Sequence, residues 1–185
     1  TAIIAVEVLA DTLDVDNGND YFYGTGSNEN YDFGEGLNNL DVVNDQDSGD
    51  GDFVFATLNG LGTVANPHGL HLINVEDITF ETATAASVID AGDITGNTFI
   101  FVDDNGGTDF ALTLFNVQDG VSVYGDSNFD ASMVVELADN HSGGEIAGGS
   151  GNDILSGAYG DDVIYGGYGD DVLNAGGEPH FNVEG

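Results

Sequence analysis

The stretch GGSGNDILSGAYGDDVIYGGYGDDVLN, residues 148–174, repeats one pattern three times at an interval of nine residues. The units are residues 148–156, 157–165 and 166–174, and each reads G-[GA]-x-G-x-D-x-[IL]-x. A short fixed period is typical of solenoids, in which each structural unit stacks on the next. This stretch therefore predicts an all-β fold, a parallel β-solenoid whose C-terminal part is built from these units.

Each nonapeptide combines a turn with a strand. Six turn residues rich in glycine precede a three-residue strand, whose middle side chain is Leu155, Ile164 or Leu173. One such side chain cannot be buried by its own unit, but stacked units bury a continuous apolar column. We expect two nonapeptides to form one full coil, so that turns on the same side belong to units two apart.

An aspartate stands at the sixth position of every unit, as Asp153, Asp162 and Asp171. With units two apart in neighbouring coils, Asp153 and Asp171 should face each other among glycine-rich backbone carbonyls. A cage made only of oxygen, with flexible coordination, suits Ca²⁺ better than Mg²⁺, which demands octahedral geometry. An Asn/Asp/Gly-rich hairpin region without an ion is the alternative.

These three units resemble the RTX (repeats-in-toxin) β-roll family of secreted bacterial proteins. The resemblance implies carbonyl ligands from the first and third turn residues of one unit and the second and fourth of its partner. It also implies folding triggered by extracellular calcium. The expected metal-site residues are Gly148, Gly149, Ser150, Gly151, Asp153, Gly157, Tyr159, Gly160, Asp162, Gly166, Gly167, Tyr168, Gly169 and Asp171.

The flanking frames depart from the pattern. Residues 139–147 have Gly144 at the sixth position, and residues 175–183 have His180 there. Asp162 is therefore expected to face a defective partner on both sides, while Asp153 and Asp171 form one complete site. We expect one to three ions.

Two earlier segments of the chain contain residues at a similar spacing. Residues 17–26 place Gly18, Asp20 and Phe22 at the repeat's spacing, and residues 49–55 contain a looser version around Asp52. Each is either a further metal site or an ordinary polar turn, and we favour the turn.

The rest of the chain also predicts strands. Short alternating runs occur at residues 52–58, 97–103, 109–117, 121–125 and 132–138, separated by turn residues. We divide the chain into an Asn/Asp/Gly-rich part (residues 1–55), a ladder of short strands (56–140) and the repeat array with a short tail (141–185), together one elongated domain. Residues 70–120 resemble the β-solenoid of calcium-dependent bacterial surface-layer proteins, through the step Leu72, Asn74, Val75, Glu76 and Ile78.

Charge excludes several partners. The chain has 34 acidic residues and no lysine or arginine, a formal net charge of −34. Nucleic acids and anionic membrane surfaces are bound through basic side chains, so we expect neither as a partner. An anionic polysaccharide would need bridging cations. Self-repulsion should also leave the chain loose without divalent cations at low ionic strength.

No cysteine is present, so disulfides and thiolate metal sites are impossible. No run approaches the ~18 apolar residues of a membrane-spanning helix. Residues 1–10 are apolar but lack a basic segment, so we expect a processed chain or an excerpt rather than a signal peptide.

Catalytic motifs are sparse. Residues 68–71, HGLH, offer His68 and His71 without the HExxH pattern, so we expect a polar loop rather than a zinc site. G-x-S-x-G is absent, and paired carboxylates leave a glycosidase open by residue type alone. We expect that the chain is not an enzyme.

The leading functional hypothesis is a secreted, calcium-dependent structural protein, located outside the bacterial cell or on its surface. Its partners would be copies of itself, joined head to tail or by strand addition into a filament or surface layer. Residues 3–9 form an apolar strand that either pairs with a neighbouring subunit or covers its own core. The alternative is a calcium-bridged adhesin or carbohydrate-binding module, reaching cell-surface polysaccharide through calcium.

Overall fold

The computed structural model describes residues 12–14, 21–24, 30–34, 42–45, 51–82, 85–103, 106, 108–177 and 182–184. Its side chains are described from residue 51 to 177 within these ranges, together with Val43. The leading residues 3–9, Asp20 and His180 lie outside the described residues. Every regular element in the described ranges is a β-strand.

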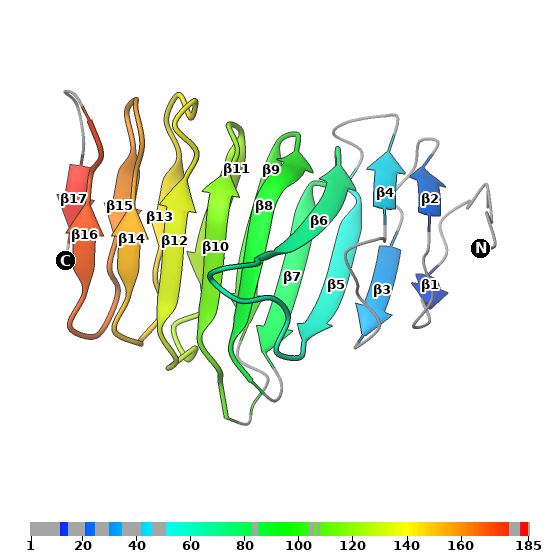
Figure 1. The fold of residues 1–185 in the computed structure, drawn as a ribbon, viewed down its shortest axis with the longest axis horizontal. Helices are drawn as coiled ribbons and strands as arrows, with labels where there is room; N and C mark the ends of the chain where they lie inside the picture. Colours follow the sequence, from blue (N-terminus) through cyan, green and yellow to red (C-terminus); the bar gives the residue numbers. More distant parts are fainter. Residues whose placement is uncertain are drawn as a thin grey trace.

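The strands form two parallel sheets that run along the whole solenoid (Figure 1). One sheet contains β1 (Thr12–Asp14), β3 (Asn30–Gly34), β5 (Phe53–Leu58), β7 (Asp77–Thr82), β9 (Thr98–Asp103), β11 (Val121–Gly125), β13 (Glu145–Ala147), β15 (Val163–Tyr165) and β17 (Asn182–Glu184). The other contains β2 (Tyr21–Gly24), β4 (Val42–Asp45), β6 (His68–Ile73), β8 (Ser87–Thr95), β10 (Leu112–Val117), β12 (Met133–Leu137), β14 (Ile154–Ser156) and β16 (Val172–Asn174). Odd and even strands alternate between the sheets, so each coil contributes one strand to each. The predicted parallel β-solenoid is confirmed.

In-register stacking builds the core. Val54, Ile78, Ile100 and Val123 are register partners on successive strands of the odd-numbered sheet, and all are fully buried. Ile146 and Ile164 continue the same column. Because side chains on a strand alternate between faces, one inward residue per strand suffices for an unbroken apolar column.

The predicted strands lie where expected, except that one begins later than predicted. The run at residues 109–117 becomes strand only at Leu112, because the Phe110 N–H bonds to the Thr82 hydroxyl, 2.9 Å away, instead of a ladder carbonyl. The interpretation of residues 68–71 as a loop was wrong, since they begin β6. Within the described residues, no helix is long and apolar enough to span a membrane.

The apolar column should dominate stability. We expect Val123→Ala to lower the free energy of unfolding by about 1.5–3 kcal/mol, because its side chain is fully buried. Val64→Ala is the matched control, since Val64 is 72% exposed and its loss should cost less than about 0.5 kcal/mol. Urea denaturation of the calcium-loaded chain measures both, and equal losses would contradict the inward placement of Val123.

Candidate metal centre

The turn at residues 166–171 lies directly on the turn at residues 148–153. The Tyr168 N–H donates to the Gly149 carbonyl (3.1 Å), and the Asp170 N–H donates to Asn152 Oδ1 (2.8 Å). The strands that follow are also register partners, with Leu155 opposite Leu173. Units two apart are therefore neighbours, as the repeat predicted.

Each sixth-position aspartate reaches back to the preceding coil. Asp171 Oδ1 accepts a hydrogen bond from the Asp153 N–H (2.9 Å), and Asp153 Oδ1 accepts one from the Met133 N–H (2.7 Å). Asp162 Oδ1 does the same with the Gly144 N–H at 3.1 Å. One carboxylate oxygen of each unit thus ties two coils together, and Asp153 and Asp171 are adjacent as expected.

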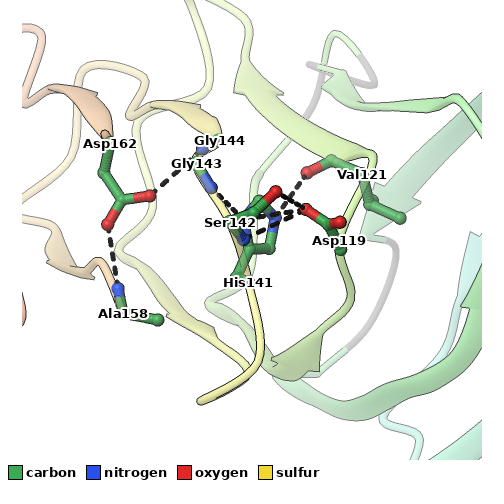
Figure 2. Close-up of polar contacts among 8 residues, drawn as sticks. All are labelled: Asp119, Val121, His141, Ser142, Gly143, Gly144, Ala158 and Asp162. Carbon is green, nitrogen blue, oxygen red and sulfur yellow. Dashed lines mark hydrogen bonds and ion pairs between the residues drawn. The ribbon is translucent and has the colours of Figure 1, made fainter. Parts of the chain in front are cut away.

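The second oxygens of Asp162 and Asp153 differ. Asp162 Oδ2 accepts the Ala158 N–H at 3.0 Å, so both oxygens of this buried carboxylate are satisfied by backbone donors (Figure 2). Asp153 Oδ2, in contrast, is buried and makes no hydrogen bond of good geometry with the described residues. Burial raises the pKa of Asp153 and the neighbouring Asp171 carboxylate raises it further, whereas the N–H groups of Met133 and Gly149 lower it. Asp153 Oδ2 is therefore the oxygen in this turn that most needs a cation.

The first-position glycines leave room for these carboxylates. A Cβ at Gly148 would overlap Asp153 Oδ2 and the Gly166 carbonyl oxygen, and a Cβ at Gly166 would overlap Asp171 Oδ2. At Gly157 it would lie 2.5 Å from Asp162 Oδ2. A real Cβ cannot approach oxygen so closely, so the glycine at position one is a steric requirement of the aspartate at position six.

The backbone conformation at the fourth position of the last unit also requires glycine. Gly169 has a φ of 121°, which side chains with a Cβ rarely adopt, and a Cβ there would overlap the Gly151 carbonyl oxygen. The stacked turns thus bring backbone oxygens very close to the neighbouring unit. This close approach is the setting in which carbonyls can serve as metal ligands.

The donor set around Asp153 and Asp171 fits calcium. It offers two carboxylates and nearby backbone carbonyls, without sulfur. Across the described part of the chain, no three His, Asp or Glu side chains gather as a metal-binding group. Backbone carbonyls would then supply the remaining ligands, and a hard cation with flexible coordination such as Ca²⁺ accepts that arrangement.

The remaining predicted residues lie in the same stacked turns. The side chains of Tyr159 and Tyr168 are 63% and 74% exposed, so only their carbonyls can face an ion. Gly149 and Gly151 are buried, while Ser150 and Gly160 are partly exposed. The assignment of individual carbonyls as ligands stays a prediction.

A family model described as the RTX calcium-binding nonapeptide repeat (4 copies) matches residues 9–40 and 147–178. The chain carries RTX calcium-binding repeats. No curated protein and no solved structure matches it significantly. The expected cofactor, calcium, is thereby confirmed for the repeats, and repeats of this kind are typical of secreted bacterial proteins.

The match also corrects one interpretation. Residues 17–26, for which we favoured an ordinary polar turn, lie within the first matched range and therefore belong to an RTX repeat. In the backbone register, Phe22 of β2 pairs with Val43 of β4 on the next coil. The spacing of Gly18, Asp20 and Phe22 already indicated a repeat. A single copy of that spacing is not enough to distinguish a repeat from an ordinary turn of similar composition.

Glu76, which the sequence analysis named only as part of the motif at residues 72–78, makes the same kind of contact between coils as the sixth-position aspartates. Its Oε2 accepts hydrogen bonds from the N–H groups of Asp52 (3.0 Å) and Gly51 (3.3 Å) on the preceding coil. Glu76 lies two residues before the inward-facing Ile78, as Asp162 lies two residues before Ile164. This shared spacing is the sequence feature from which the contact could have been predicted. Residues 49–55 lie outside both matched ranges.

The two histidines of β6 do not form a site together. His71 Nδ1 lies 2.9 Å from Asp93 Oδ2 on the next strand, and both side chains are largely exposed. His68 is partly buried, and burial lowers its pKa. Residues three apart on a strand point to opposite faces, so the geometry gives no shared zinc site.

Asp171→Ala should weaken calcium binding roughly tenfold or more, because it removes a charged ligand beside Asp153. Asp161→Ala is the matched control, since Asp161 is exposed and occupies the fifth position of its unit. Isothermal titration calorimetry with Ca²⁺ compares the two variants. Equal effects would show that the repeat register is wrong.

Proposed function

We propose that the chain is a secreted structural protein that uses calcium to assemble head to tail, as a filament or surface layer outside the cell. The role is architectural rather than catalytic. The observation that carries the proposal is the presence of calcium-binding repeats in two separate stretches, residues 9–40 and 147–178.

The C-terminal coil leaves its core accessible. Leu173 is partly exposed, although its register partner Leu155 is fully buried, and neighbouring Val172 is 59% exposed. In the described part of the chain, β16 pairs with β14 on one side and has no strand on the other. Another coil could pair with this edge of β16 and cover Leu173 and Val172.

The distribution of the repeats supports a second copy as the partner. The matched residues 9–40 span β1, β2 and β3, and residues 147–178 span β14, β15 and β16. These strands stand at opposite ends of the solenoid in Figure 1. A coil of one copy stacked on the last coil of another would place Asp171 between two turns, as Asp153 is within one chain.

Charge makes the ion necessary for this contact. Two copies, each with a formal charge of −34, repel each other on approach. Calcium bound between the stacked turns would neutralise the carboxylates that meet there. Assembly would then depend on extracellular calcium.

Electron microscopy of the purified chain tests assembly. We expect ordered polymers in millimolar Ca²⁺ and dispersed particles in chelator, because the junction loses its counter-ions. Asp171→Ala should prevent polymers, and the exposed-site control Asp161→Ala should keep them. Monodisperse monomers of the unaltered chain under both conditions would refute the proposal.

A second candidate is a calcium-bridged adhesin that binds cell-surface polysaccharide. Phe99, Phe101 and Tyr124 form an aromatic cluster on the outer face of the odd-numbered sheet, with ring centroids 5.7–6.5 Å apart. Phe101 and Tyr124 also line a cavity of about 390 Å³ that includes Asp103 and Asp126. Ring faces beside two carboxylates are suited to a sugar that shares a calcium ion with the protein.

Phe101→Ala should reduce retention on polysaccharide-coated surfaces several-fold in calcium, because it removes one wall of this cavity. Tyr165→Ala is the control, since Tyr165 is similarly exposed on the same sheet but does not line the cavity. Surface plasmon resonance with and without Ca²⁺ measures both variants. Equal retention of all three proteins would exclude this cavity as the binding site.

A further inference from the structure

The coil at residues 139–147 departs from the repeat yet keeps its stacking. Gly144 stands at the sixth position, where the three units of the array have aspartate. Its N–H donates to Asp162 Oδ1 (3.1 Å), and its carbonyl accepts the Val163 N–H (2.8 Å). The backbone is therefore in the register of a calcium repeat, although the carboxylate is missing.

The imidazole of His141 fills the space inside this turn. Its side chain is completely buried, and a Cβ at Gly144 would lie 2.5 Å from its Cε1 and 3.0 Å from its Nε2. Figure 2 shows the ring in the turn beneath Gly143 and Gly144. Only glycine fits at residue 144 while the ring is there.

The ring is held by backbone groups of two coils. The Gly143 N–H donates to His141 Nδ1 (3.3 Å), and Nε2 lies 3.4 Å from the Val121 carbonyl of the preceding coil. This pattern assigns the hydrogen to Nε2, which donates it to Val121. Asp119 Oδ1, 3.8 Å from Nδ1, is itself held by the backbone N–H and hydroxyl of Ser142.

The first position of this coil has changed together with the sixth. In the array, a glycine at position one makes room for the carboxylate at position six. Here position one is Asp139, which has a Cβ, and position six is Gly144. The coil thus has neither the carboxylate of a calcium repeat nor the glycine that would accommodate it.

We infer that the His141 side chain replaces the sixth-position carboxylate and the calcium ion that it would hold. The turn at residues 139–144 is closed by an imidazole joined to backbone groups, so this coil needs no ion. The C-terminal calcium array therefore begins at Gly148. The inference rests on the calcium role of the repeats, and it does not depend on assembly.

Restoring the repeat tests this role directly. The triple variant Asp139→Gly, His141→Ser, Gly144→Asp should bind about one more Ca²⁺ per chain than the unaltered protein, because it pairs a new carboxylate with Asp162. Gly144→Asp alone should gain no ion and should melt at a lower temperature, because the ring occupies the site. Asn140→Asp is the matched control, since it adds the same charge at an exposed residue of the same turn.

Calorimetric stoichiometry and thermal melting are measured on each variant of the whole 185-residue chain, at concentrations where size-exclusion chromatography gives a monomer. A folded triple variant that binds as many ions as the unaltered chain would overturn the inference. So would an additional ion in Gly144→Asp or Asn140→Asp. Because the readout is a difference in bound ions, failure of head-to-tail assembly would leave it unchanged.

His141→Ala supplies a second measurement that does not require the new site. Loss of the ring should lower the melting temperature by a similar amount at half-saturating and at saturating Ca²⁺, because its contacts do not involve an ion. A melting temperature equal to that of the unaltered protein, or a loss that grows in proportion to bound Ca²⁺, would overturn the inference.

Discussion

The contact between a side-chain acceptor on one coil and a backbone N–H on the coil before it underlies this structure. Asp171, Asp162 and Asp153 all make it, and Glu76 makes it near the other end of the described side chains. A chain without lysine or arginine has few cationic partners for its carboxylates. Backbone donors at the turns therefore provide the partners that basic side chains provide elsewhere, and they fix the register of the coils.

The position of these carboxylates, two residues before the inward residue of each strand, is occupied by other side chains elsewhere in the solenoid. In the centre it is occupied by Thr98, whose hydroxyl donates to the Val75 carbonyl at 2.7 Å, and by Val121, its register partner. On the other sheet, Leu112 and Met133 are the corresponding buried residues. The centre is thus closed by hydroxyl and apolar groups, whereas the C-terminal coils are closed by carboxylates. His141 lies in the coil between these two regions of the solenoid.

The nine-residue period was sufficient to predict the solenoid, two strands per coil and the pairing of Leu155 with Leu173, because these follow from periodicity alone. The adjacency of Asp153 and Asp171 followed from the same register. The contact of Glu76 was not predicted because Glu76 lacks the flanking glycines of the repeats, although it has their spacing from the inward residue. The role of His141 was not predicted because the position of its ring inside the turn depends on three-dimensional packing. The first repeats, at residues 9–40, were underestimated because their spacing is irregular and a single short copy resembles an ordinary turn.

Stacking along one axis also determines how the molecule should respond to force. The principal contacts of each strand are with the strands two before and two after it in the chain, so interactions are confined to adjacent coils. A pull on the last coil would peel β16 from β14 while leaving the earlier coils intact. Extension should therefore proceed in small regular steps. Calcium bound between coils would raise the force that each step requires.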